Sequence, residues 1–265
     1  GRNMNYATKL CIVSMMSVFS VSSIGLVQAA DTPIVSTGGA AYNIGIPGDS
    51  NFTNSDNVSL GGQAGTSNGN PYQKPNDPNA KGNNIAIGRI SLNGSSGGAN
   101  VALGSKTFLN GKGDYNFLGN FAAGFNSTIS NTIAIGSFAG SGATGNKNVW
   151  LGAGQAGGST GNNTVLIGSN STVDGNFNYG IGHNAVLKGE SNAVVGAYNH
   201  VTANNTYVLG DHVDTTLNNA VVLGSHSTAE SSDVVSTPSY TYAGGTVNFA
   251  GTAPVSTVSV GATNQ

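Results

Sequence analysis

The segment Asn131-Thr132-Ile133-Ala134-Ile135-Gly136 decides the fold of this chain. Its pattern, a turn asparagine, a short apolar run and a glycine, recurs along the sequence. The glycines that close such runs are separated by 27, 16, 15, 17, 16, 16, 14, 14, 14 and 14 residues. They are Gly61, Gly88, Gly104, Gly119, Gly136, Gly152, Gly168, Gly182, Gly196, Gly210 and Gly224. A period this regular indicates a stacked repeat.

Each repeat fits one coil of a narrow β-solenoid. An apolar strand of three or four residues ends at the glycine, and a weaker second strand follows, as in Asn184-Ala185-Val186-Leu187. Two strands and two turns account for about 14 residues. The sequence therefore predicts an all-β, parallel β-roll with coils of about 14–16 residues. We expect glycine to supply positive φ at the bend, and asparagines to hydrogen-bond to one another and to the turn backbone.

Composition excludes other classes of protein. The chain of 265 residues contains 41 glycines and 35 asparagines, and only 8% of its residues are charged. Glycine and asparagine disfavour a helical bundle. The hydrophobic content of 38% and the net charge of −2 disfavour charge-driven disorder. A collagen helix needs glycine at every third position, and seven prolines without that register do not provide it.

The short strands are apolar on both faces. In a strand, the residues one and three positions before the glycine, such as Ile135 and Ile133, point to one face. The residue two positions before the glycine points to the opposite face. We expect the paired residues to line the coil interior and the opposite face to meet identical chains, because strands apolar on both faces need cover on both. The predicted interface residues are Ala86, Ala102, Phe117, Ala134, Trp150, Leu166, Val194, Val208 and Val222.

The repeats resemble the Asn-Ser-Val-Ala-Ile-Gly motif of YadA-like trimeric autotransporter adhesin heads. The resemblance covers about residues 57–230 and is carried by Asn131–Gly136, Asn84-Ile85-Ala86-Ile87-Gly88 and Asn100-Val101-Ala102-Leu103-Gly104. It implies a left-handed parallel β-roll homotrimer displayed on the outer membrane of a Gram-negative bacterium. It also implies attachment to host matrix proteins, such as collagen or fibronectin, or to a host cell receptor, and self-association with other bacterial heads.

Two alternatives to adhesion follow from the sequence. One is a purely self-associating structural or biofilm protein. The other is a solenoid enzyme that degrades polysaccharides. Candidate ligand-binding residues come from the motif itself, namely Asn131, Ile133, Ala134, Ile135 and Gly136, and from a proline-containing inserted loop over 62–83. The loop candidates are Pro71, Tyr72, Lys74 and Pro75.

The chain divides into four predicted parts. An apolar run from Leu10 to Val27 follows Lys9 and ends in Val27-Gln28-Ala29. This pattern predicts that residues 1–29 are upstream residues and a signal peptide cleaved after Ala29. A membrane anchor is the alternative. Residues 30–56 form an N-terminal cap, 57–230 the roll, and 231–265 a C-terminal cap. The resemblance implies that a neck, a stalk and a C-terminal membrane anchor follow Gln265.

Chemistry other than binding has weak signals. Without Arg2 and Lys9 the mature chain has seven basic and eleven acidic residues, a net charge of −4, which disfavours nucleic acid as a partner. Gly152-Ala153-Gly154-Gln155-Ala156-Gly157 matches a dinucleotide-binding pattern but is followed by a turn, where that pattern needs a helix.

His183, His200, His212 and His226 fall on different coils, so we expect no metal, no cofactor and no catalytic residue. Tyr240, Tyr242 and Phe249 predict a hairpin that caps the roll.

Overall fold

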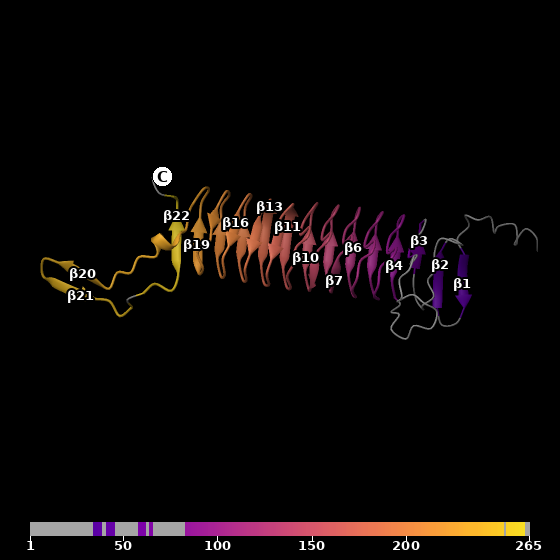
Figure 1. The fold of residues 1–265 in the computed structure, drawn as a ribbon, viewed down its shortest axis with the longest axis horizontal. Helices are drawn as coiled ribbons and strands as arrows, with labels where there is room; N and C mark the ends of the chain where they lie inside the picture. Colours follow the sequence, from indigo (N-terminus) through magenta and orange to yellow (C-terminus); the bar gives the residue numbers. More distant parts are fainter. Residues whose placement is uncertain are drawn as a thin grey trace, which may run out of the picture.

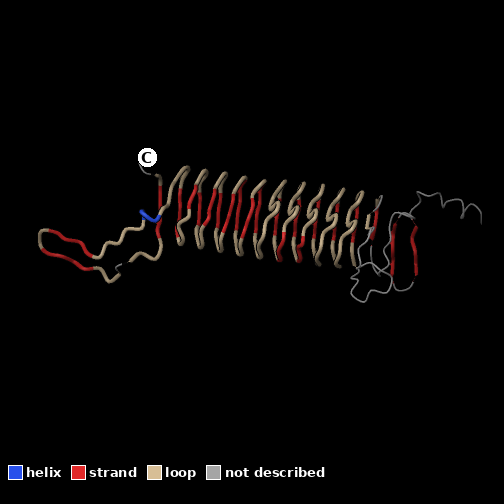
Figure 2. Tube along the Cα trace, in the orientation of Figure 1, coloured by secondary structure: helices blue, strands red, loops and turns tan. Residues whose placement is uncertain are grey.

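The computed structural model describes residues 34–38, 41–45, 58–61, 64–65, 83–251 and 253–262. Short strands stack coil upon coil into a straight rod (Figure 1), with turns between them and a 3-10 turn, η2 (Ser231–Asp233), near the C-terminal end (Figure 2). The predicted all-β solenoid is confirmed. The predicted signal peptide, the cleavage site at Ala29, almost all of the 62–83 loop and its candidates Pro71, Tyr72, Lys74 and Pro75 lie outside the described residues.

One long sheet of fourteen strands runs the length of the rod. Its first pair is antiparallel and all its other pairs are parallel. In spatial order its strands are β1 (Ile34–Gly38), β2 (Ala41–Gly45), β3 (Val58–Leu60), β4 (Ile85–Ile87), β5 (Val101–Leu103), β6 (Phe117–Gly119), β8 (Ile133–Ile135), β10 (Val149–Leu151), β11 (Val165–Ser169), β13 (Tyr179–His183), β15 (Ala193–Val195), β17 (Tyr207–Leu209), β19 (Ala220–Leu223) and β22 (Thr257–Val260).

The predicted second strands form the opposite wall of the coil. They make two shorter parallel sheets. One pairs β7 (Thr128–Ser130) with β9 (Thr144–Asn146), and the other runs through β12 (Thr172–Asp174), β14 (Val186–Lys188), β16 (His200–Thr202) and β18 (Asp214–Thr215). Each coil is therefore a flattened loop with one strand of the long sheet on one side and one turn or short strand on the other.

The register confirms the period and corrects one repeat. Paired positions on the long sheet are 16 residues apart from Ile85 to Val165 and 14 apart from Val165 to Val221. In the one irregular coil, Leu103 pairs with Gly119, so Asn120, and not Gly119, occupies the bend position that Gly104 holds in the preceding coil. Asn120 adopts φ 83°, and the sequence gaps of 15 and 17 become two gaps of 16. An asparagine can take the glycine position because its short polar side chain tolerates positive φ.

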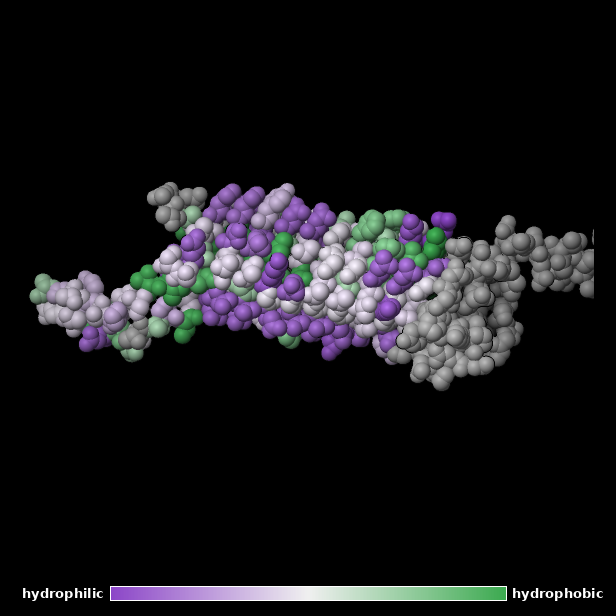
Figure 3. Space-filling model, viewed as in Figure 1, coloured by the Kyte–Doolittle hydropathy of each residue, from purple (hydrophilic) through white to green (hydrophobic). Residues whose placement is uncertain are grey.

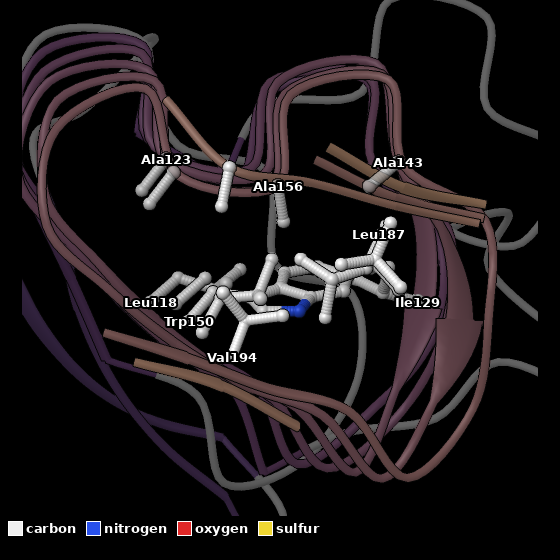
Figure 4. Packing of buried hydrophobic residues seen from close by; sticks show 14 of the residues in the cluster. Leu118, Ala123, Ile129, Ala143, Trp150, Ala156, Leu187 and Val194 are labelled. Carbon is white, nitrogen blue, oxygen red and sulfur yellow. The ribbon is translucent and has the colours of Figure 1, made fainter. Parts of the chain in front are cut away.

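The predicted inside and outside of the strands are reversed. In β8, β10 and β17 the central residue points into the coil and its two neighbours point out, and the equivalent second residue of β11 and β13 is likewise buried. Ala86, Ala102, Ala134, Trp150, Leu166, Val194, Val208 and Val222, eight of the nine predicted interface residues, are at most 3% exposed. The ninth, Phe117, is 42% exposed because the irregular coil places Leu118 inside. Figure 4 shows Leu118, Trp150 and Val194 facing Ile129 and Leu187 across the interior.

The reversal has a physical cause in the repeated asparagine. Asn148 lies two residues before Trp150, so in a strand the two side chains share a face, and both are buried. Its Nδ2 donates to the Gly161 carbonyl at 3.0 Å, and its Oδ1 accepts from Thr164 N at 2.9 Å. The polar asparagine therefore belongs to the interior, where it links one coil to the next. Asn100, Asn116, Asn178 and Asn192 occupy equivalent places with equivalent bonds.

The glycine at the bend is required by the close approach of adjacent coils. Gly152 has φ 122°, and a Cβ there would overlap the carbonyl oxygen of Gly168 in the next coil. Any side chain at Gly152 would be both strained by this backbone angle and in collision with the next coil. The predicted role of glycine is thus confirmed, with steric contact between coils as an additional reason.

The C-terminal region differs from the predicted cap. The hairpin exists, as β20 (Ser239–Tyr242) paired antiparallel with β21 (Gly245–Asn248). It projects beyond the end of the rod (Figure 1), and Tyr240 and Tyr242 are exposed. The chain then returns, and β22 pairs in parallel with β19 as the last strand of the long sheet.

We predict that Asn148→Ala lowers the free energy of unfolding by about 2–3 kcal/mol, because the buried Thr164 N–H and Gly161 carbonyl lose their partner. Asn162→Ala is the matched control. The Asn162 side chain is exposed and donates a hydrogen bond to Asn176, so its loss changes stability by about 0.5 kcal/mol or less. Denaturant unfolding at one fixed protein concentration compares the two variants. Equal losses would contradict the proposed role of the buried asparagine.

Candidate functional site: the apolar face of the long sheet

The outward face of the long sheet is a continuous apolar surface, and we call it the apolar face. From β4 to β19 the two outward residues of each strand form two columns that follow the rod. Within this described stretch the columns contain no charged residue. Their members are Ile85, Ile87, Val101, Leu103, Phe117, Gly119, Ile133, Ile135, Val149, Leu151, Val165, Ile167, Tyr179, Ile181, Ala193, Val195, Tyr207, Leu209, Val221 and Leu223.

Parallel pairing in register builds these columns. Ile133 lies beside Val149, which lies beside Val165, and Ile135 lies beside Leu151. Adjacent strands are about 4.8 Å apart, so neighbouring side chains touch along each column. They remain open to solvent, because Ile133 and Ile135 are each 41% exposed, and the exposed fraction of Leu209 is 59%. An exposed apolar surface of this extent marks an interaction site on a soluble protein.

The opposite wall is chemically different. Outward positions of β12, β14, β16 and β18 include Asp174, Lys188, His200, Thr202 and Asp214. Along the side shown in Figure 3, hydrophilic residues gather at the upper and lower edges of the C-terminal half of the rod, and residues of intermediate hydropathy with a few hydrophobic ones lie between them. The rod therefore has one apolar side, formed by the long sheet, and one polar side, formed by the opposite wall. Contact with water is unfavourable for the first side and favourable for the second.

The motif residues divide between core and surface. Ile133 and Ile135 belong to the apolar face, and Asn131 is exposed at the turn, where its Nδ2 donates to Asn146 Oδ1 at 3.0 Å. Gly136 is half-buried at the bend. Ala134 is fully buried, so it is excluded both from ligand contact and from contact with a sister chain. The predicted ligand site therefore loses Ala134.

The predicted hydrogen bonding between stacked asparagines is confirmed at the turns, where Asn205 Nδ2 donates to Asn219 Oδ1 at 3.2 Å. Sequence reasoning missed a second ladder, whose members are not the repeat asparagines. Exposed Asn162 donates through Nδ2 to Asn176 Oδ1 at 3.0 Å, and Asn176 Nδ2 donates to Glu190 Oε1 at 3.1 Å. Asn204 N donates to Asn218 Oδ1 of the next coil at 2.7 Å. Spacings of 14 between these polar turn residues are the signal that could have found this second ladder. The polar side thus presents repeated amide groups at the coil spacing.

Comparison with known proteins supplies no relative: no protein-family model and no characterised protein matches the chain. Among the described residues, no helix has the length and apolar character needed to cross a membrane.

Proposed function

We propose that this chain is the head of a trimeric bacterial surface adhesin, exported and held at the outer membrane, which binds host matrix or cell-surface proteins and other heads through many weak contacts. The observation that carries the proposal is the apolar face, which runs along the rod and is open to solvent in the single chain. The repeat's resemblance to adhesin heads supports the same assignment.

Identical chains are the best cover for the apolar face. Its columns repeat at the coil spacing, so a second rod of the same period can match it along the whole length. A closed ring of rods about one axis turns every apolar face inward. Each half-exposed aliphatic side chain that becomes buried contributes about 1 kcal/mol, and the contribution recurs in every coil.

An assembly of this kind leaves the polar side outward. The amide ladders and the strands β12, β14, β16 and β18 then face the surroundings in each of three copies. A weak contact repeated along a rod and multiplied by three gives strong attachment through effective concentration. Adhesion therefore needs no catalytic group.

The polysaccharide-degrading alternative requires two carboxyl groups flanking a substrate. A groove of about 260 Å³ lies on the polar side where coils shorten from 16 to 14 residues, lined by Gly157–Thr160, Thr172–Asp174 and Val186–Lys188. Among these described residues Asp174 is the one carboxylate, and it accepts a hydrogen bond from the Thr160 hydroxyl. The groove favours binding over hydrolysis.

We predict that the purified full chain sediments as a trimer, and that Ile133→Glu with Ile135→Glu converts it to single chains, because two carboxylates per chain cannot be buried unpaired in the interface. Thr128→Glu with Thr144→Glu is the matched control: the same two charges sit on β7 and β9 of the opposite wall, where both threonines are exposed. The control should remain a trimer in analytical ultracentrifugation. A folded monomer for the unaltered chain would contradict the proposal.

We predict that beads coated with the full chain bind at least one member of a panel of matrix proteins that includes collagen and fibronectin. Beads that clump with one another but ignore the whole panel would instead support the purely self-associating alternative, and turnover of glycans in solution would support the enzyme. Deleting residues 66–80 tests the inserted loop, while Gly65, whose N–H bonds to the Ser91 carbonyl, is kept. Unchanged binding by an intact trimer would place the ligand site on the roll surface.

A further inference from the structure

A ladder of aromatic rings occupies one corner of the C-terminal coils. Tyr198, His212 and His226 each lie two residues after a bend glycine, with φ of 55–56°. Because the coils stack in register, their rings stack as well, with centroids 4.8 Å apart from Tyr198 to His212 and from His212 to His226. His183 extends the ladder beyond Tyr198 at the same separation. Histidines from different coils are thus brought together by the repeat.

A carboxylate lies against the two stacked imidazoles. Asp211 Oδ2 is 2.8 Å from His212 Nδ1. The hydrogen bonds from His212 and from Ser225 hold the pKa of Asp211 below its ordinary value. The candidate ligand atoms of Asp211, His212 and His226 all lie within 4.8 Å of one another. A negative charge and two imidazole nitrogens therefore converge on one exposed corner.

We infer that Asp211, His212 and His226 bind a divalent transition-metal ion at this corner. Imidazole suits zinc, copper and nickel, whereas calcium and magnesium prefer sets made of oxygen ligands alone. Two nitrogens and one carboxylate oxygen make three of the four positions of a tetrahedral zinc site, and the fourth stays open to water or another ligand. All three ligands come from one chain, so the site rests neither on the trimer nor on adhesion.

The geometry requires only side-chain adjustment. Two ligand atoms on one tetrahedral zinc ion are about 3.3 Å apart, given bonds of about 2.0–2.1 Å. The present separations of up to 4.8 Å therefore close by at most about 1.5 Å. The two rings are almost parallel, at 3°, and both histidines are exposed, so they can rotate to aim their nitrogens at one point. The backbone is already fixed, because His226 N donates to the Asp211 carbonyl at 2.8 Å.

A second histidine–aspartate pair on the same rod provides an internal control. His200 Nδ1 lies 3.7 Å from Asp214 Oδ1 on the opposite wall. His200 Nε2 lies 3.3 Å from the Thr202 hydroxyl, and within the described residues no further histidine, cysteine or carboxylate completes a set of three there. This pair has a similar local charge and exposure but one ligand fewer.

The test is titration of the full chain, made without a histidine tag, with zinc chloride at neutral pH by isothermal calorimetry. We expect one zinc ion per chain for the unaltered protein. His212→Gln and His226→Gln should each weaken binding at least about tenfold, and Asp211→Asn should weaken it less, because an amide oxygen remains a weak ligand. His200→Gln should bind as the unaltered chain does. Cobalt(II) absorption reports the geometry of the bound ion.

Two results would overturn the metal site. One is absence of zinc binding by the unaltered chain, and the other is equal binding by the unaltered chain and by the double variant His212→Gln with His226→Gln. Circular dichroism of each variant verifies that the roll is retained. Because stoichiometry is counted per chain, a monomeric or non-adhesive protein would still give a clear answer, so failure of the metal site and failure of the proposed function are distinguishable.

Discussion

The hydrogen bonds that join each coil to the next are the constraint on which the rest of the structure depends. A three-residue strand is too short to be stable alone, and it forms because its main-chain groups pair on both sides. The buried asparagines extend that pairing into the turns, where Asn148 binds both Gly161 and Thr164 of the following coil. Regular stacking then brings equivalent residues together at every position of the coil.

Stacking explains why one sequence pattern has such different consequences at different positions. At the strand centre it buries Trp150, Leu166 and their equivalents in a narrow core. At the strand flanks it joins isolated aliphatic residues into the apolar face. At the corner it stacks His212 on His226. None of these clusters would form if adjacent coils slipped by one residue, because alternate side chains would then exchange faces.

Much of the fold could be predicted from the sequence, and the period alone was enough for the solenoid. The sequence pattern predicts the wrong orientation of the strands, because it places Asn148 and its equivalents in the turns and not in the core. Once the asparagine side chain is counted with Trp150, the interior is a mixed polar and apolar face, and the face of aliphatic and aromatic residues is the outer one. Hydrophobicity by itself favours the opposite choice. A polar group becomes a core residue only when its hydrogen bonds are satisfied, and those bonds run between coils.

The candidate site was predicted only in part for the same reason. The sequence identifies Ile133 and Ile135 as important but assigns them to the core, and it names His212 and His226 but rejects a metal site because they belong to different coils. In a solenoid, residues 14 apart in the chain are nearest neighbours. Proximity must therefore be judged by position within the coil and not by distance along the chain.

The step from 16 to 14 residues has a consequence for how such a protein can vary. Between the stacked corner residues the longer coil has seven steps, from Gly154 to Gly161, and the next coil has five, from Asn170 to Gly175. Meanwhile Val149, Val165 and Tyr179 continue the long sheet without interruption. Residues can thus be gained or lost on the polar side while the apolar columns keep their alignment. The polar side is free to diversify under selection, and in the proposed trimer the apolar surface between copies can stay the same.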